Sequence, residues 1–144
     1  MRPRFGFTAI EMITVLAIVA IVAAFGYPRL AAQLQRTRVH QAARVLAADI
    51  EVAASLAARD QRPMIFEGVA NGYRIRDRTT GAVRFRRTIG PGTEFGVRAL
   101  HFEPTSVEFF PSGMTSSPMW VRLTNSGYTR QVQLSRAGFV RVTP

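Results

Sequence analysis

The chain has 144 residues, which suits one small domain with an attached segment, and 47% of them are hydrophobic, as in proteins that bury a core. It has no cysteine, which excludes thiol nucleophiles, thiolate metal sites and disulfides. All 19 basic residues are arginines, against 9 acidic residues. This excess favours anionic partners such as nucleic acid, anionic lipid or an acidic protein surface, and genomic base composition is the alternative explanation for using arginine alone.

The first segment along the chain has the properties of a membrane span. No charge occurs from Met12 to Pro28, and with residues 7–11 this run would form a helix of about 33 Å, enough to cross a hydrocarbon core of roughly 30 Å. Arg2 and Arg4 precede it, so the positive-inside rule places the N-terminus in the cytoplasm. We therefore predict a single transmembrane helix over residues 7–28.

Glu11 stands out because a carboxylate in a bilayer is rare, costly and usually paired. It either lies near the interface and reaches the headgroups or has a function inside the membrane. The residues around it, Gly6-Phe7-Thr8-Ala9-Ile10-Glu11, resemble the type III signal of type IV pilins and type II secretion pseudopilins.

This resemblance implies that residues 1–6 are a leader, that a prepilin peptidase cleaves between Gly6 and Phe7, and that Phe7 becomes N-methylated. It also implies that Glu11 pairs with the N-terminal amine of a neighbouring subunit during filament assembly. A buried carboxylate that meets a cation loses most of its desolvation penalty, which agrees with this role. Pro28 falls where many pilins carry a helix-interrupting proline, but Ala20 replaces their common glycine, which weakens the expectation of local helix melting.

An amphipathic helix is predicted over residues 29–60, ending near Arg59 because Pro63 cannot lie inside a helix. It would pack in the filament, cover a sheet, or do both. Its apolar face has spacings of three and four: Val39, Ala42, Ala43, Leu46, Ile50, Ala53 and Ala57. We assign its other face to Arg36, Arg38, Arg44, Asp49 and Glu51.

After Pro63 the hydrophobic period becomes two, which predicts a head of short antiparallel strands over residues 63–144. The expected fold is α+β and pilin-like, with a long N-terminal helix followed by this β-rich head. Thr88 to Phe95 is predicted to be a loop. The expected strands are 64–67, 72–76, 83–87, 97–102, 107–110, 119–123, 129–134 and 139–142.

The carboxyl half resembles the head of H-type minor pseudopilins and FimT-like minor pilins. The shared pattern is a strand ending in Phe-x-x-x-Gly, here Phe109 to Gly113, then a variable loop, two strands and a closing strand after Gly138. No catalytic set is evident: His40 and His101 lack ligands at metal spacing, and Glu103 and Glu108 fall on different strands. We therefore expect neither an enzyme nor a cofactor.

A basic hairpin is the main surface feature. Arg74 and Arg76 alternate with apolar residues on one strand, and Arg84 and Arg86 do so on the next. A three-residue loop with Gly81 in the left-handed conformation would place Arg76 opposite Arg84 and Arg74 opposite Arg86. Opposed like charges favour an anionic partner, whereas a solvated face neutralised by local acids is the alternative.

Two functions follow from the resemblance. The first is a structural minor pseudopilin, assembled with other pseudopilins from the bacterial inner membrane into the periplasmic filament of a type II secretion system. The second is a FimT-like minor pilin in an extracellular filament that binds DNA for uptake. DNA-binding relatives typically have Gly-Arg-x-Arg near the carboxyl end, where this chain has Gly138-Phe-Val-Arg141 and keeps only Arg141 of the two arginines.

Overall fold

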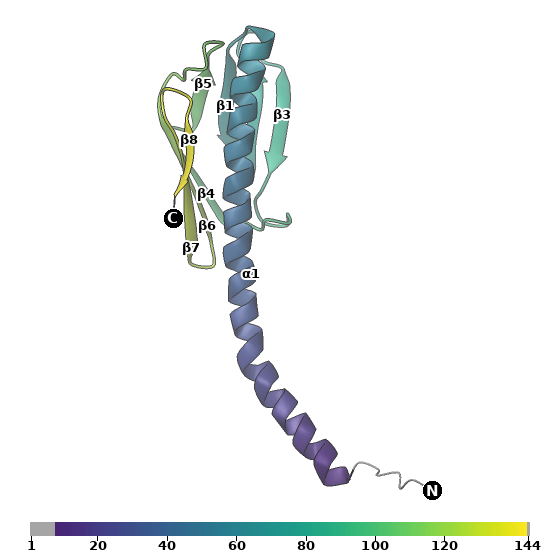
Figure 1. The fold of residues 1–144 in the computed structure, drawn as a ribbon. Coiled ribbons are helices and arrows are strands. Elements are labelled where there is room, and N and C mark those ends of the chain that lie inside the picture. Colours follow the sequence, from purple (N-terminus) through teal and green to yellow (C-terminus); the bar gives the residue numbers. More distant parts are fainter. Residues whose placement is uncertain (1–7, 144) are drawn as a thin grey trace, which may run out of the picture. The chain divides into compact units, whose positions relative to one another are not determined.

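The computed structural model describes residues 8–143. The chain forms two compact units, and the boundary between them in the sequence falls between Leu34 and Gln35. The helix α1 (Ala9–Asp60) contributes to both units, and eight strands follow it (Figure 1). The predicted α+β class with an antiparallel head is confirmed, and α1 ends one residue after the predicted end at Arg59. Both units are described separately below.

The first unit consists of the N-terminal part of α1, up to Leu34. Its large apolar side chains are exposed, including Ile10, Phe25 and Leu34. By length and composition alone, α1 is able to cross a membrane. Apolar residues exposed on all faces of a helix indicate an apolar environment or a protein partner around it.

The second unit contains the head, which has two four-stranded antiparallel sheets. Sheet A has the order β3-β2-β1-β5, and sheet B has the order β4-β6-β7-β8. In sheet A the strands are β1 (Met64–Val69), β2 (Gly72–Asp77), β3 (Val83–Thr88) and β5 (Ser106–Phe109). In sheet B they are β4 (Ala99–Glu103), β6 (Met119–Asn125), β7 (Tyr128–Leu134) and β8 (Val140–Thr143).

All eight strands predicted from the sequence are present, with ends that differ by one or two residues. The predicted loop between Thr88 and Phe95 is also present, between β3 and β4. It is held to the core by Ile89 and Val97, which are buried and joined by a backbone hydrogen bond of 3.1 Å. The alternation of apolar residues was therefore a sufficient signal for the strands.

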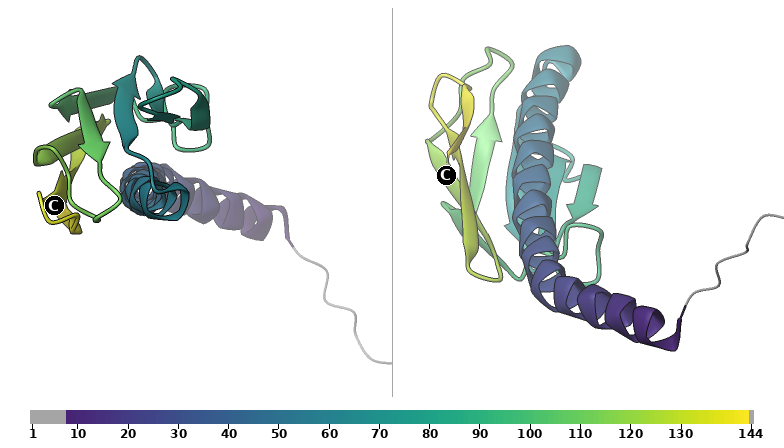
Figure 2. Two further views of the ribbon diagram at one scale, coloured as in Figure 1. Left: turned by 90° about the horizontal axis from the view of Figure 1, so that it is seen from above. Right: turned by 60° about the horizontal axis from the view of Figure 1, so that its bottom comes forward.

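The part of α1 from Gln35 to Asp60 packs against both sheets, as the two views in Figure 2 show for the head. Its predicted apolar face is confirmed, because all seven residues assigned to it are fully buried. Four of the seven are alanines, which contribute little side-chain volume to the core. The sheets add alternate large side chains to the same core, among them Phe66, Tyr73, Phe109, Met119 and Leu123.

Asp49 was assigned to the polar face of the helix, and this assignment is wrong because the residue is buried. The Tyr73 hydroxyl donates to Asp49 Oδ2 at 2.7 Å, and Arg87 donates from Nε to Oδ2 and from Nη2 to Oδ1. Burial and the neighbouring carboxylate raise the pKa of Tyr73, while the hydrogen bond to Asp49 raises that of Arg87. The buried charge is thus paired and joins α1 to sheet A.

Replacing Arg87 tests this join, with the adjacent Arg86 as a matched control. Arg87→Gln should lower the free energy of unfolding by about 2 kcal/mol, because the buried carboxylate loses its charged donor. Arg86→Gln should change it by less than about 0.5 kcal/mol, because that side chain is exposed. Denaturant unfolding of the full chain in nonionic micelles, followed by near-UV circular dichroism, measures both. Equal losses in the two variants would contradict a specific role for the Asp49 pair.

Candidate assembly and anion-binding surfaces

The first candidate surface is the apolar part of α1 with Glu11 in its first turn. The backbone N–H of Glu11 donates to Thr8 Oγ1 at 3.3 Å, so Thr8 caps the helix. Among residues 8–143, no hydrogen bond or ion pair is found for the Glu11 carboxylate. A carboxylate on an apolar helix without a partner in its own chain requires water, headgroups or a cation from elsewhere.

Thr8 and Glu11 form the Thr-x-x-Glu pattern of a capping box, which the sequence interpretation missed. This gives Glu11 a second possible role, because a glutamate at this position can accept a hydrogen bond from the backbone N–H of the capping residue. The spacing of three between Thr8 and Glu11, directly before an apolar run, was the signal. Capping needs an acceptor oxygen only, whereas pairing with an amine needs the negative charge.

The other residues predicted to act in processing and assembly are Gly6, Phe7 and Pro28. Gly6 and Phe7 lie outside the described residues, so their cleavage and methylation stay predictions. Pro28 lies within α1, which continues as a helix through this position.

The second candidate surface is the outer face of sheet A, where the predicted basic hairpin lies. β2 and β3 are paired, Arg74 faces Arg86 as predicted, and Gly81 has the expected positive φ of 73°. The predicted pairing of Arg76 with Arg84 is wrong, because Arg76 faces Val83. The register shifts beside Arg76, so one extra residue is accommodated in β3.

This bulge gives Arg84 a different partner. Its Nη2 lies 3.2 Å from Asp60 Oδ2 at the end of α1. The predicted loop was three residues, whereas the strands are joined by the five residues 78–82, held by Asp77. Asp77 Oδ1 accepts from the backbone N–H groups of Thr79 at 2.7 Å and Thr80 at 3.0 Å. These backbone hydrogen bonds, together with nearby arginines, lower the pKa of the buried Asp77 carboxyl.

The arginines that stay on the outer face are partly neutralised. Glu67 on β1 contacts Arg74 and lies 3.3 Å from Arg76. Burial raises the pKa of Glu67, but the hydrogen bonds and charges of the two arginines outweigh it and the net direction is downward. Arg86 is exposed and has no acidic partner among the described residues. Of the four arginines predicted to bind anions together, one therefore leaves the cluster and two share a carboxylate.

The third candidate surface is the outer face of sheet B, which holds the fifth predicted anion-binding residue, Arg141 on β8. Arg141 is thus on a different sheet from the basic hairpin. It lines a pocket of about 490 Å³ together with Trp120, Gln133 and Phe139, of which Trp120 and Phe139 are exposed.

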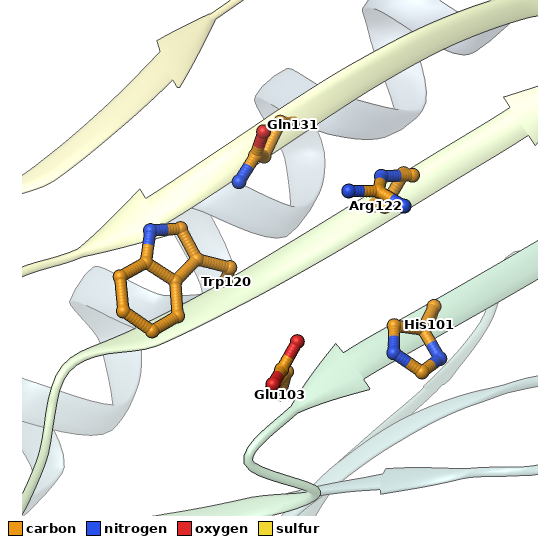
Figure 3. Close-up of a pocket in the computed structure, with 5 residues that line it drawn as sticks. All are labelled: His101, Glu103, Trp120, Arg122 and Gln131. Carbon is orange, nitrogen blue, oxygen red and sulfur yellow. The ribbon is translucent and has the colours of Figure 1, made fainter.

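Trp120 also borders a second pocket of about 190 Å³ on the same face (Figure 3). Its other lining residues are His101 and Glu103 from β4, Arg122 from β6 and Gln131 from β7. Tryptophan and arginine side chains beside open pockets are found at the centres of many protein–protein interfaces. The sequence interpretation missed this face, although Trp120 and Arg122 alternate with buried residues along β6.

No group of three or more histidine, cysteine or acidic side chains that could hold a metal occurs in the described part of the chain. Glu103 and Glu108 lie on β4 and β5, which belong to different sheets.

Comparison with known proteins places this geometry in a family. The family model described as "Type II transport protein GspH" matches residues 42–138, which is more than half of the chain. The chain belongs to the GspH family. No curated protein matches it.

Two solved structures support the fold, both of the type IV minor pilin FimU from Pseudomonas aeruginosa strain PAO1. The crystal form in space group P21 has 19% sequence identity and a TM-score of 0.58, covering 76% of this chain and 90% of that chain. The form in P65 has 18% identity and the same TM-score, covering 73% and 92%. At this identity the likeness shows a shared fold: this GspH-family chain has the pilin architecture of a long helix and an antiparallel head.

Proposed function

We propose that this GspH-family protein is a minor pseudopilin that assembles from the bacterial inner membrane into the periplasmic filament of a type II secretion system. The observation that carries the proposal is the first turn of α1, where the Glu11 carboxylate has no partner among the described residues on a helix that can cross a membrane. An ion pair with the amine of a neighbouring subunit would supply that partner at a fixed helix register.

The head offers a surface suited to contacts between subunits. Trp120 and Phe139 are exposed on the outer face of sheet B, beside Arg122 and Arg141. Burial of such aromatic and arginine side chains provides much of the binding energy in protein interfaces. When a subunit is extracted from the membrane into a filament, its head needs such contacts with the heads of neighbouring subunits.

The second candidate is DNA binding during uptake. Exposed Arg86 and the overall excess of arginine favour it, since phosphate neutralisation dominates non-specific DNA affinity. The sheet A face gives it less support than the sequence alone did. Glu67 is shared by Arg74 and Arg76, Arg84 contacts Asp60, and Arg141 lies on the other sheet.

The first prediction of this proposal concerns processing. Protein purified from its native membrane should lack residues 1–6 and carry one additional methyl group on Phe7, as measured by intact mass. Gly6→Val, which places a branched side chain at the cleavage position, should keep the full-length mass. An intact Met1 form of the parent would contradict this processing. So would cleavage after Ala24, where a secretory signal peptidase would cut after the small residues that end the apolar run.

The second prediction separates the two roles of Glu11. Glu11→Gln keeps the hydrogen-bonding capacity of a capping box but removes the charge, whereas Glu11→Leu removes both. Both variants should insert in the membrane at least as well as the parent, because a costly charge is absent, and both should be depleted from sheared or cross-linked filaments. If the Gln variant assembles like the parent and the Leu variant does not, helix capping rather than ion pairing explains Glu11.

A third prediction tests DNA binding on sheet A, using the full chain in nonionic micelles and a short duplex. Log affinity falls by about 0.9 per log salt for each neutralised phosphate. Arg74→Gln/Arg76→Gln should change that slope no more than the charge-matched control Arg98→Gln/Arg122→Gln, which removes two exposed arginines outside the predicted anion-binding set. The reason is that Glu67 already contacts both guanidinium groups of the first pair. If the slope of log affinity against log salt decreases by about two in Arg74→Gln/Arg76→Gln but not in the control, DNA uptake is supported over secretion.

A further inference from the structure

A pocket of about 310 Å³ lies where α1 meets β7 and β8, away from the surfaces described above. His40 and Arg44 line it from α1, Arg130 lines it from β7, and Val142 and Thr143 line it from β8. The spacing of four between His40 and Arg44 places both on the same face of the helix. The topology thus brings Arg130 to His40 and Arg44, which lie 90 and 86 positions earlier in the sequence.

His40, one of the lining residues, has an unusual side-chain atom. Its Nδ1 is buried and has no hydrogen-bond partner among the described residues. Buried polar atoms are nearly always paired, and an unpaired one beside a pocket indicates a ligand or ordered water that completes it.

The two arginines are also without acidic partners in the described part of the chain. Arg130 donates from Nη1 to the carbonyl of its neighbour Thr129 at 3.2 Å. Thr143 uses its hydroxyl hydrogen to donate to the carbonyl of Gln131 at 3.3 Å, so the hydroxyl is not a free donor. One turn before His40, Arg36 is held over the ring of Tyr128 at 5.1 Å and adds to the positive charge along this edge.

We propose that this pocket binds a phosphate group, with Arg44 and Arg130 as charged donors and the His40 imidazole as a third hydrogen-bonding group. Two permanent positive charges from different elements suit a dianion better than a single carboxylate, and guanidinium groups match phosphate oxygens in geometry. Val142 gives the pocket an apolar wall, so a phosphate monoester with a small organic substituent fits the same site. The phosphate could be free in solution or belong to a lipid headgroup.

The two histidines of the chain permit a test with an internal control. The full chain, labelled with ¹⁵N-histidine, is titrated with inorganic phosphate in nonionic micelles at constant ionic strength. The imidazole resonances of His40 should shift saturably, whereas those of His101, on the outer face of sheet B, should not. Parallel, non-saturating shifts of both histidines would show ionic screening and overturn the proposal.

Variants identify the donors. Arg44→Gln and Arg130→Gln should each weaken phosphate binding by about tenfold or more, because each removes a charged hydrogen-bond donor. Arg38→Gln removes an exposed arginine from the same helix and should leave the affinity unchanged. An unchanged His101 spectrum verifies that each variant is folded. An equal loss in all three variants would mean that net charge, not the pocket, binds phosphate.

Two further experiments distinguish a soluble phosphate from a lipid headgroup. Glycerol phosphate should compete with inorganic phosphate for the His40 resonance. Nanodiscs of phosphatidylcholine with phosphatidic acid, compared with phosphatidylcholine alone, show whether a lipid headgroup reaches the pocket. A shift with inorganic phosphate but not with phosphatidic acid identifies a soluble ligand, and a shift with both identifies the headgroup. Absence of a His40 shift in every arm would refute the site.

Discussion

The head depends on the burial of one face of α1. Seven residues of that face are fully buried, and both sheets contribute side chains to the core that forms around them. Neither sheet shares a strand with the other, so the helix supplies the surface on which both are packed. The apolar area that this packing removes from water stabilises the helix and both sheets together.

The same packing explains why Asp49 can be buried. A carboxylate on the core side of a helix has a large desolvation cost unless its oxygens are paired. Sheet A places Tyr73 and Arg87 within hydrogen-bonding distance of these oxygens. The hydrogen bonds of Asp49 with Tyr73 and Arg87 fix the orientation of the helix on sheet A, which apolar contacts alone do not specify. An alanine-rich helix face could rotate or slide on a sheet, whereas three hydrogen bonds from two residues to one carboxylate select a single register.

Much of the fold could be predicted because it follows from hydrophobic period. The three-and-four spacing from Val39 to Ala57 identified the buried helix face, and alternation identified all eight strands. The errors came from tertiary contacts. Asp49 resembles a surface residue in the sequence, and only the fold shows that β3 brings Arg87 to it. Likewise, the bulge beside Arg76 accompanies a contact between Arg84 and Asp60, which is distant in the sequence.

The candidate sites were less predictable for the same reason. Thr8 and Glu11 were within reach of sequence reasoning, because capping is local. The pocket at His40 was not, since nothing in the sequence indicates that a strand 90 residues later places Arg130 beside it.

The distribution of acids determines which arginines are available. Asp49, Asp60, Glu67, Asp77 and Glu108 all contact arginines on sheet A, its turn or the end of α1. None of the described ion pairs involves Arg44, Arg122, Arg130 or Arg141, which lie on α1 or on sheet B. Apart from Arg86, the strand arginines without a described ion pair therefore lie on sheet B. This positive charge is divided between a pocket beside α1 and an aromatic face, and neither forms the continuous row of free arginines that neutralising successive DNA phosphates requires. A charge distribution of this kind suits separate small contacts, such as one phosphate group and one neighbouring protein, better than a long polyanion.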